Sequence, residues 1–255
     1  MQNKQTAALK KLLEENFQRF HHSGFIEEDP IAIPHTFSKK EDIEISGFLT
    51  AIIAWGQRKS ILNNARRLLV LMDDSPHDFI VNHTEKDRAK AIGFVHRTFN
   101  ADDLIYFLAA LQNIYVQHGG LEQAISKSSG SMAERLAAFK SLFFEMEHLK
   151  RTEKHVANPL KGSSAKRLNM FLRWMVRDAA AGVDFGLWQS IKASELMIPL
   201  DVHSAKVGRK LGLLKRKQND WKAVEELTEN LRKFDPQDPV KYDFALFGMG
   251  VNNVK

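Results

Sequence analysis

The 255-residue sequence contains no cysteine. Disulfide bonds are therefore excluded, and so is any zinc or iron–sulfur site held by thiolates. No apolar run approaches the roughly 20 residues that a transmembrane helix needs, and the N-terminal stretch MQNKQTAALKKLLEE lacks the apolar core of a signal peptide. The histidines also lack the spacing of a metal site. These absences predict a cytoplasmic protein with no metal, no other cofactor and no membrane partner.

Positive charge exceeds negative charge modestly, with 37 Lys and Arg against 31 Asp and Glu. Much of the excess lies between Lys150 and Lys217, so one region concentrates the basic side chains. A local cluster of Lys and Arg favours a polyanionic partner more strongly than the net charge does. We therefore expect this region to contact a nucleic acid.

Apolar residues recur with the period of an α-helix along most of the chain, and no segment alternates with period two. The pattern predicts an all-α protein of about a dozen short helices without a sheet. Ser38, followed three residues later by Glu41, predicts a capping box for a buried helix that reaches Trp55. Asn100 and Ser131 are expected to cap helices over 101–117 and 131–149.

The sequence PLKGSSAKRL at 159–168 predicts a tight turn that leads into a helix over 165–177. A turn of small residues before a helix presents unpaired backbone N–H groups and the positive end of the helix dipole, which suit a phosphate. Lys166 stands in the first turn, and an unprotonated lysine is the nucleophile of Schiff-base enzymes. The alternative is an ordinary surface lysine that extends its amine into solvent.

A second helix start follows the apolar run Ile198-Pro199-Leu200, where Asp201 precedes VHSAKVGRKLG. An aspartate in this place is first of all a helix N-cap, which stabilises a helix by about 1 kcal/mol. Together with Lys166 it would form a pair of a nucleophile and a proton acceptor. The residue types leave both interpretations open.

Three segments resemble the helix-hairpin-helix DNA glycosylase superfamily, which includes endonuclease III and 8-oxoguanine DNA glycosylase. Gly162-x-x-x-Lys166 resembles the hairpin with its lysine, and Pro199-Leu200-Asp201-Val202-His203 resembles the Pro-Val-Asp-x-His segment. The apolar helix that ends at Trp55-Gly56-Gln57 resembles the helix that begins the superfamily's helical barrel. As a whole, the chain also resembles an uncharacterised bacterial family.

This resemblance implies an all-α fold of two helical lobes with a cleft between them. Residues 40–180 would form a barrel-like lobe that ends in the hairpin, and residues 1–39 with 185–255 would form the second lobe. The implied function is that of a base-excision DNA repair glycosylase with lyase activity, which acts as a monomer on damaged duplex DNA. Lys166 would attack the sugar of a flipped nucleotide and form a Schiff base, and Asp201 would assist as the proton acceptor.

The resemblance also implies the residues that contact DNA. Gln57 would fill the space left by the flipped nucleotide, while the hairpin and the helix after Asp201 would hold the strand. The DNA-binding residues expected in this way are Gly162, Ser163, Ser164, Gln57, His203, Lys206 and Arg209.

Two features depart from the superfamily's pattern. Ser164 stands where the hairpin usually has its second glycine, and the connector from Lys166 to Asp201 is longer than in most members.

Two other functions are consistent with the sequence. The chain could be a non-catalytic nucleic-acid binder on the same scaffold, which needs only the basic hairpin. It could also be a helical protein–protein adaptor, which predicts an exposed apolar patch.

Overall fold

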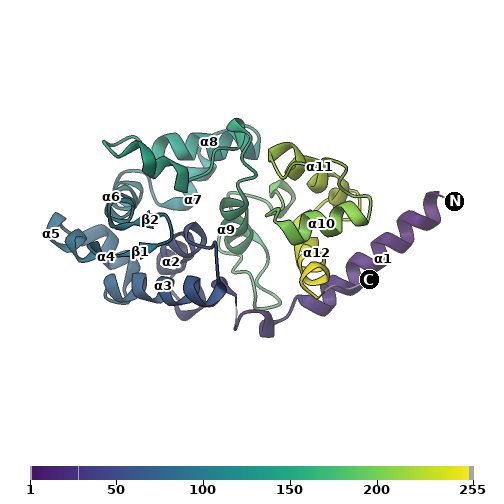
Figure 1. Cartoon of the computed structure of the whole chain (residues 1–255), viewed down its shortest axis with the longest axis horizontal. Helices are drawn as coiled ribbons and strands as arrows, with labels where there is room; N and C mark the ends of the chain where they lie inside the picture. The colour runs from purple at the N-terminus through teal and green to yellow at the C-terminus, as the bar shows by residue number, and fades with distance from the viewer. Residues whose placement is uncertain (1, 28, 253–255) are drawn as a thin grey trace. The chain divides into compact units, whose positions relative to one another are not determined.

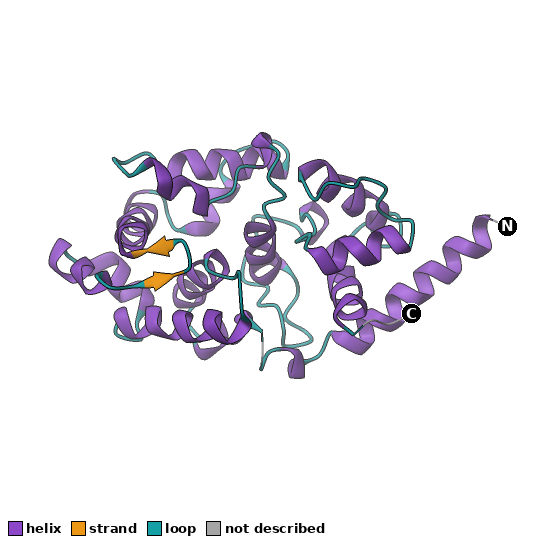
Figure 2. Ribbon diagram, viewed as in Figure 1, coloured by secondary structure: helices purple, strands orange, loops and turns teal. Residues whose placement is uncertain are grey.

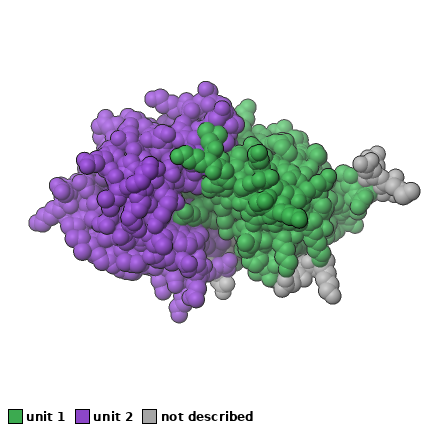
Figure 3. Space-filling model, turned by 45° about the horizontal axis from the view of Figure 1, so that its top comes forward, with its two compact units in different colours: residues 1–27, 159–255 green, residues 28–158 purple. Residues whose placement is uncertain are grey.

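Helices account for most of the chain in the computed structural model, which describes residues 2–27 and 29–252 (Figures 1 and 2). The chain forms two compact units, one of residues 28–158 and the other of residues 1–27 and 159–255 (Figure 3). The division implied by the resemblance put the hairpin and Lys166 in a lobe of residues 40–180. In the structure they belong to the unit that contains both chain ends, together with Asp201.

The unit of residues 28–158 is arranged around α2 (Lys40–Ile52), which is buried from Ile43 onward. Phe48 of this helix contacts the rings of Phe107, Phe139 and Phe143, so an aromatic cluster fills the core. Around α2 lie the helices α3 (Arg58–Leu71), α4 (Pro76–Asn82), α5 (Glu85–Arg88), α6 (Ala101–Gln117), α7 (Leu121–Ser126) and α8 (Met132–Phe143), with 3₁₀ turns at Pro30–Ala32, Pro34–Thr36, Ala89–Ala91 and Lys150–His155.

The helix ends of this unit test the predicted caps. Asn100 and Ser131 cap α6 and α8, as predicted, and each does so in a capping box. The prediction for Ser38 is wrong, because α2 begins at Lys40 with Lys39 in the cap position and no side-chain cap. Helix α8 also ends at Phe143, short of the expected residue 149.

The expectation of no sheet also needs correction. Within the described residues the strands are β1 (Val95–His96) and β2 (Phe99–Asn100), which pair antiparallel and are orange in Figure 2. Arg97 in the turn between them takes the left-handed conformation, with φ of 56°. Strands of two residues are too short to produce a period-two pattern in the sequence.

The unit that contains the chain ends is built from α1 (Gln2–Phe20), α9 (Lys166–Val176), α10 (Val202–Lys210), α11 (Trp221–Arg232) and α12 (Tyr242–Val251), with 3₁₀ turns at Ser23–Phe25, Pro159–Lys161, Ala193–Glu195 and Pro239–Lys241. Helix α12 packs against both α1 and α10. Two glycines allow this packing. A Cβ on Gly248 would lie 2.2 Å from the Phe20 ring, and one on Gly250 would lie 2.8 Å from the His203 Cβ.

A network of buried charges lies at the centre of this unit. Arg173 of α9 donates to Asp243 of α12 over 2.6 Å and to Asp184 over 3.3 Å. Arg177 pairs with Asp184 and donates to Asp238 over 2.9 Å. The side chains of both arginines and of Asp184 and Asp243 are buried, at most 8% exposed, while Asp238 is 27% exposed. Buried charges of this kind are tolerated only when they are paired, so the network fixes how α9 and α12 pack.

His21 lies next to this network, stacked on Phe17 and in contact with Phe244. Burial, followed by the charge of Arg177, lowers the pKa of His21 from 6.5 to about 4. Its Nε2 atom is buried and finds no hydrogen-bond partner among the described residues. The folded protein therefore keeps His21 neutral at pH values where the unfolded chain protonates it.

We expect the His21→Phe variant to lose less stability in acid than the wild type. Because the folded pKa of His21 is depressed, its contribution is present above about pH 6.5 and is lost as the pH falls toward about 4. Phenylalanine keeps the ring contacts but takes up no proton. Urea unfolding at about pH 7 and about pH 4.5 measures the difference. An equal loss in both proteins would contradict the assignment.

In residues 2–27 and 29–252, none of the helices has both the length and the apolar character that crossing a membrane requires. The same residues contain no group of three or more His, Asp or Glu side chains that could hold a metal ion.

Candidate functional site

The predicted tight turn is present at residues 159–165, named the hairpin below, and leads directly into α9. Gly162 donates its N–H to the Pro159 carbonyl over 2.8 Å and has a φ of 86°, a conformation that favours glycine. Ala165 is also left-handed, with φ of 46°, and its N–H donates to the Ser163 hydroxyl. Lys161, Gly162 and Ser163 are exposed. The turn thus presents its backbone and a lysine to solvent before the helix begins.

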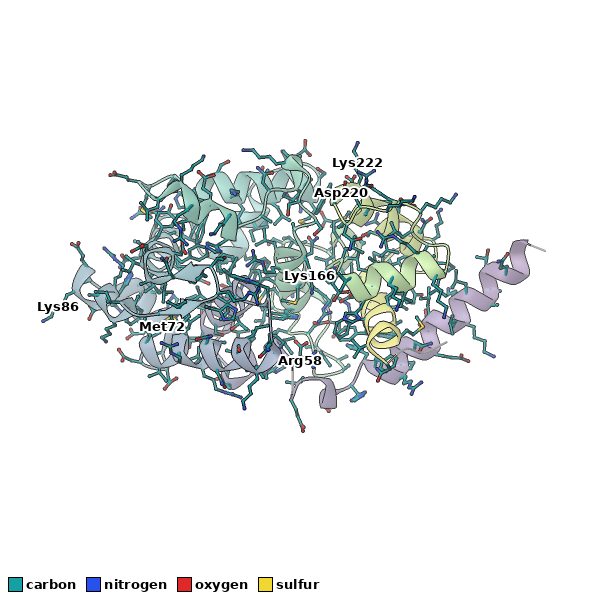
Figure 4. All side chains as sticks on the ribbon, viewed as in Figure 1. Arg58, Met72, Lys86, Lys166, Asp220 and Lys222 are labelled. Atoms are coloured by element: carbon teal, nitrogen blue, oxygen red, sulfur yellow. The ribbon has the colours of Figure 1, made fainter. Side chains whose placement is uncertain are left out.

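The hairpin is anchored to the start of α11. Ser163 and Asp220 form an isolated β-bridge, and the Trp221 N–H donates to the Gly162 carbonyl over 3.2 Å. Asp220 also caps α11 and accepts hydrogen bonds from Arg216. The hydrogen bond from Arg216 is the largest cause that lowers the pKa of Asp220 to about 2. Asp220, labelled in Figure 4, therefore remains a carboxylate at neutral pH and holds the loop that supports the hairpin.

Arg209 belongs to this support. Its guanidinium donates to the carbonyls of Arg216 and Lys217 over 2.9 Å and 2.8 Å, and to the Asn219 side chain over 2.6 Å. These contacts bind the loop between α10 and α11. The sequence predicted Arg209 as a DNA contact, whereas the structure shows three of its hydrogen bonds directed to the protein itself.

Lys166 and Asp201 lie beside each other although 35 positions separate them in the chain. The Lys166 Nζ is 3.3 Å from the Asp201 Oδ2, and the two side chains are 40% and 9% exposed. Lys166 is the first residue of α9, where Figure 4 labels it, and Asp201 is the N-cap of α10. The amine is thus accessible to a ligand, while the carboxylate is almost enclosed.

The two oxygens of Asp201 have different partners. Oδ1 accepts the Ser204 N–H over 2.7 Å, which is the cap of α10, and Oδ2 faces the Lys166 amine. The cap fixes the carboxylate and directs the second oxygen toward the lysine. The structural and the chemical interpretation of Asp201 are therefore compatible.

A buried connection links the helices that carry this pair. Asp243 of α12 accepts from Arg173 over 2.6 Å and from the Ser204 hydroxyl over 3.3 Å. Arg173 lies two turns after Lys166 on α9, and Ser204 is the residue whose N–H caps Asp201. Burial raises the pKa of Asp243 to about 6, although Arg173 acts in the opposite direction. Asp243 of α12 therefore links α9 to the first turn of α10.

The other predicted site residues have varied surroundings. The Ser164 carbonyl accepts from the Asn169 side chain over 3.2 Å. The His203 ring is partly buried and lies edge-on to Phe247, 5.9 Å between centroids, and Lys206 is exposed. Gln57 is exposed at the N-cap of α3 and belongs to the unit of residues 28–158, whereas the rest belong to the other unit.

Sequence reasoning missed the side chains that support the site. Arg216 and Asp220 are four residues apart, a spacing that could have indicated an ion pair. Asp243 stands in the otherwise apolar run YDFALFGMG, which could have indicated a buried acid with a partner. Asn169 showed no comparable signal, and it is buried between the hairpin and the Ile198 carbonyl.

A family model described as "Protein of unknown function (DUF2400)" matches residues 29–252. No curated protein and no solved structure matches the chain. The matched range contains all the candidate site residues, from Gln57 to Arg209.

Proposed function

The chain belongs to the DUF2400 family, and we propose that it is a base-excision DNA glycosylase with lyase activity on a helix-hairpin-helix glycosylase-like scaffold. The observation that carries the proposal is the 3.3 Å contact between the Lys166 amine and the Asp201 carboxylate. A nucleic-acid binder without chemistry needs a basic surface, but it does not need a nearly enclosed carboxylate aimed at an accessible amine.

The pair supplies the groups that the reaction needs. Lys166 Nζ bonds to the anomeric carbon as the bond to the base breaks, and the base leaves with the electron pair of that bond. Asp201 accepts the proton that the amine releases and stabilises positive charge that develops on the sugar. Asp201 then returns its proton to the ring oxygen as the sugar ring opens, which gives a Schiff base. Loss of a proton from the adjacent sugar carbon to solvent supplies the electron pair that eliminates the 3′ phosphate. The cap bond from Ser204 holds Asp201 in place for these steps.

The surface around the pair suits a DNA strand. The start of α9 offers backbone N–H groups to a phosphate, and the exposed Lys161 and Lys206 add positive charge. Leu160 and Val202, next in the chain to Lys161 and Asp201, are 62% and 69% exposed. Apolar side chains at such positions can pack against unstacked bases. In this proposal the damaged nucleotide is flipped out of the duplex, which costs a few kcal/mol.

Borohydride trapping tests the proposal directly. The wild-type protein is incubated with duplex oligonucleotides that carry 8-oxoguanine, an oxidised pyrimidine or an abasic site, and sodium borohydride reduces any Schiff base to a stable adduct. We expect a covalent protein–DNA species with at least one of these duplexes and none with undamaged DNA.

Binding measured across a series of salt concentrations separates the alternatives. A DNA-binding surface of several Lys and Arg loses affinity steeply as salt increases. Steep salt dependence without an adduct on any duplex would support the non-catalytic binder. Absence of both would contradict a nucleic-acid function altogether.

A further inference from the structure

A groove lies on the unit of residues 28–158, between the second half of α3 and the segment that leads into β1. Figure 1 labels α3 and β1. This basic-rimmed groove is lined by Arg66, Arg67, Val70, Leu71, Lys90, Ile92 and Phe94. None of these residues takes part in the candidate site, which lies in the other unit apart from Gln57.

The groove exposes apolar side chains that a free surface does not favour. Val70 and Ile92, which both line the groove, are 68% and 73% exposed. Leu68 and Leu69 on the same helix are buried, so α3 packs against the core through these residues and not through Val70. Branched aliphatic side chains gathered at a groove gain free energy when a ligand removes them from water.

The charged groups at the groove are mainly positive. Arg66 is exposed, and the Arg67 guanidinium lies 5.3 Å from the Phe94 ring centroid, where it also donates to Asn64. Lys90 pairs with Asp73 over 3.3 Å, which offsets one of the three cations. Arg66 and Arg67 thus leave a positive potential beside an apolar surface.

We propose that the basic-rimmed groove binds an acidic peptide segment of a partner protein, which inserts a bulky apolar side chain between Val70 and Ile92. Charge complementarity selects the acidic residues, and the exposed aliphatic surface selects the apolar one. A DNA backbone would satisfy the arginines but would leave Ile92 without an apolar contact. The proposal is independent of the glycosylase function, because it rests on a different unit and a different chemistry.

Fluorescence anisotropy with short synthetic peptides tests this binding. The probe carries a central Phe flanked by Glu residues, and two controls replace either the Glu residues with Lys or the Phe with Ser. We expect the probe to bind at least about tenfold more tightly than either control. Equal binding of the three peptides, or no binding of any, would overturn the proposal.

Surface variants locate the binding on the groove. We expect Ile92→Ser and Arg66→Glu each to weaken binding of the probe about tenfold, because both side chains are exposed and their replacement leaves the core intact. Val116→Ser, which changes a 55% exposed valine on α6 of the same unit, serves as the matched control and should bind normally. Unchanged binding by Ile92→Ser would overturn the assignment.

Two further measurements distinguish other occupants. Undamaged duplex DNA should not displace the probe at a concentration that saturates DNA binding. In sedimentation of the free protein, we expect the wild type and Ile92→Ser to show the same state of association. If DNA displaces the probe, the ligand of the groove is a nucleic acid and the peptide proposal is wrong. If the protein self-associates through Ile92, the ligand is a second copy of the chain.

Discussion

Lys166→Gln should abolish the borohydride-trapped adduct while DNA binding remains within a few-fold of the wild type. The Lys166 Nζ nitrogen bonds to the sugar in the proposed reaction, and the glutamine side chain has no nucleophile to replace it. We expect the trapped yield to fall by about 1,000-fold or more, to the background of the assay. Gel electrophoresis of the borohydride-reduced mixture measures the yield.

The control for this variant is another exposed lysine of the same unit. Lys10→Gln on α1 removes the same charge away from the hairpin and should give a normal adduct. Asp201→Asn is a useful companion, because asparagine caps a helix as well as aspartate does but accepts no proton. It should retain the fold and slow trapping about 100-fold or more. Full trapping by Lys166→Gln would show that another residue is the nucleophile.

Arg173→Met should cost about 3–5 kcal/mol of stability, because it leaves the buried Asp243 carboxylate without its cation and Asp184 with Arg177 alone. Arg173 pairs with both Asp184 and Asp243, and all three side chains are at most 8% exposed. The loss refers to the unit that contains the chain ends, and three of the four tryptophans, Trp174, Trp188 and Trp221, lie in that unit. Urea unfolding followed by tryptophan fluorescence therefore measures it.

The pH dependence of this loss gives a second readout. Burial raises the pKa of Asp243 to about 6 even with Arg173 present, so removal of the arginine raises that pKa further. When the folded pKa of a carboxyl is raised, the protein loses stability as the pH rises from the unfolded pKa to the folded pKa. The variant should therefore be least stable above neutral pH and recover in part near about pH 5.

The exposed pair Lys11 and Glu15 provides the matched comparison. Its side chains are 78% and 62% exposed, and exposed pairs contribute little because water and salt screen them. Lys11→Met should change the free energy of unfolding by less than about 0.5 kcal/mol. A similar loss in both variants would contradict the role assigned to burial.

Local features of the fold were predictable from the sequence where one short segment determines them. Asn100 and Ser131 cap helices as predicted, because each has an acidic residue three positions later within its own first turn. Ser38 shows the same spacing and fails, because α2 starts two residues later. The turn at Arg97 and the end of α8 at Phe143 depend on neighbouring segments, which periodicity does not describe.

The candidate site shows the same limit. The hairpin at Gly162 and the helix starts at Lys166 and Asp201 are local, and the sequence predicted them. Their proximity depends on the packing of α9 and α10, and only the resemblance to a known superfamily suggested it. The hydrogen bonds of Arg209 depend on the course of the loop between α10 and α11, which no pattern in the sequence describes.

The unit that contains both chain ends has a consequence for synthesis on the ribosome. Helix α1 is made before residues 28–158, but it packs on α12, which is made after them, through contacts such as that between Phe17 and Phe244. Residues 28–158 leave the ribosome in between and can fold before α12, against which α1 packs, has been made. The Lys166–Asp201 pair therefore acquires its final support only after translation reaches the end of α12.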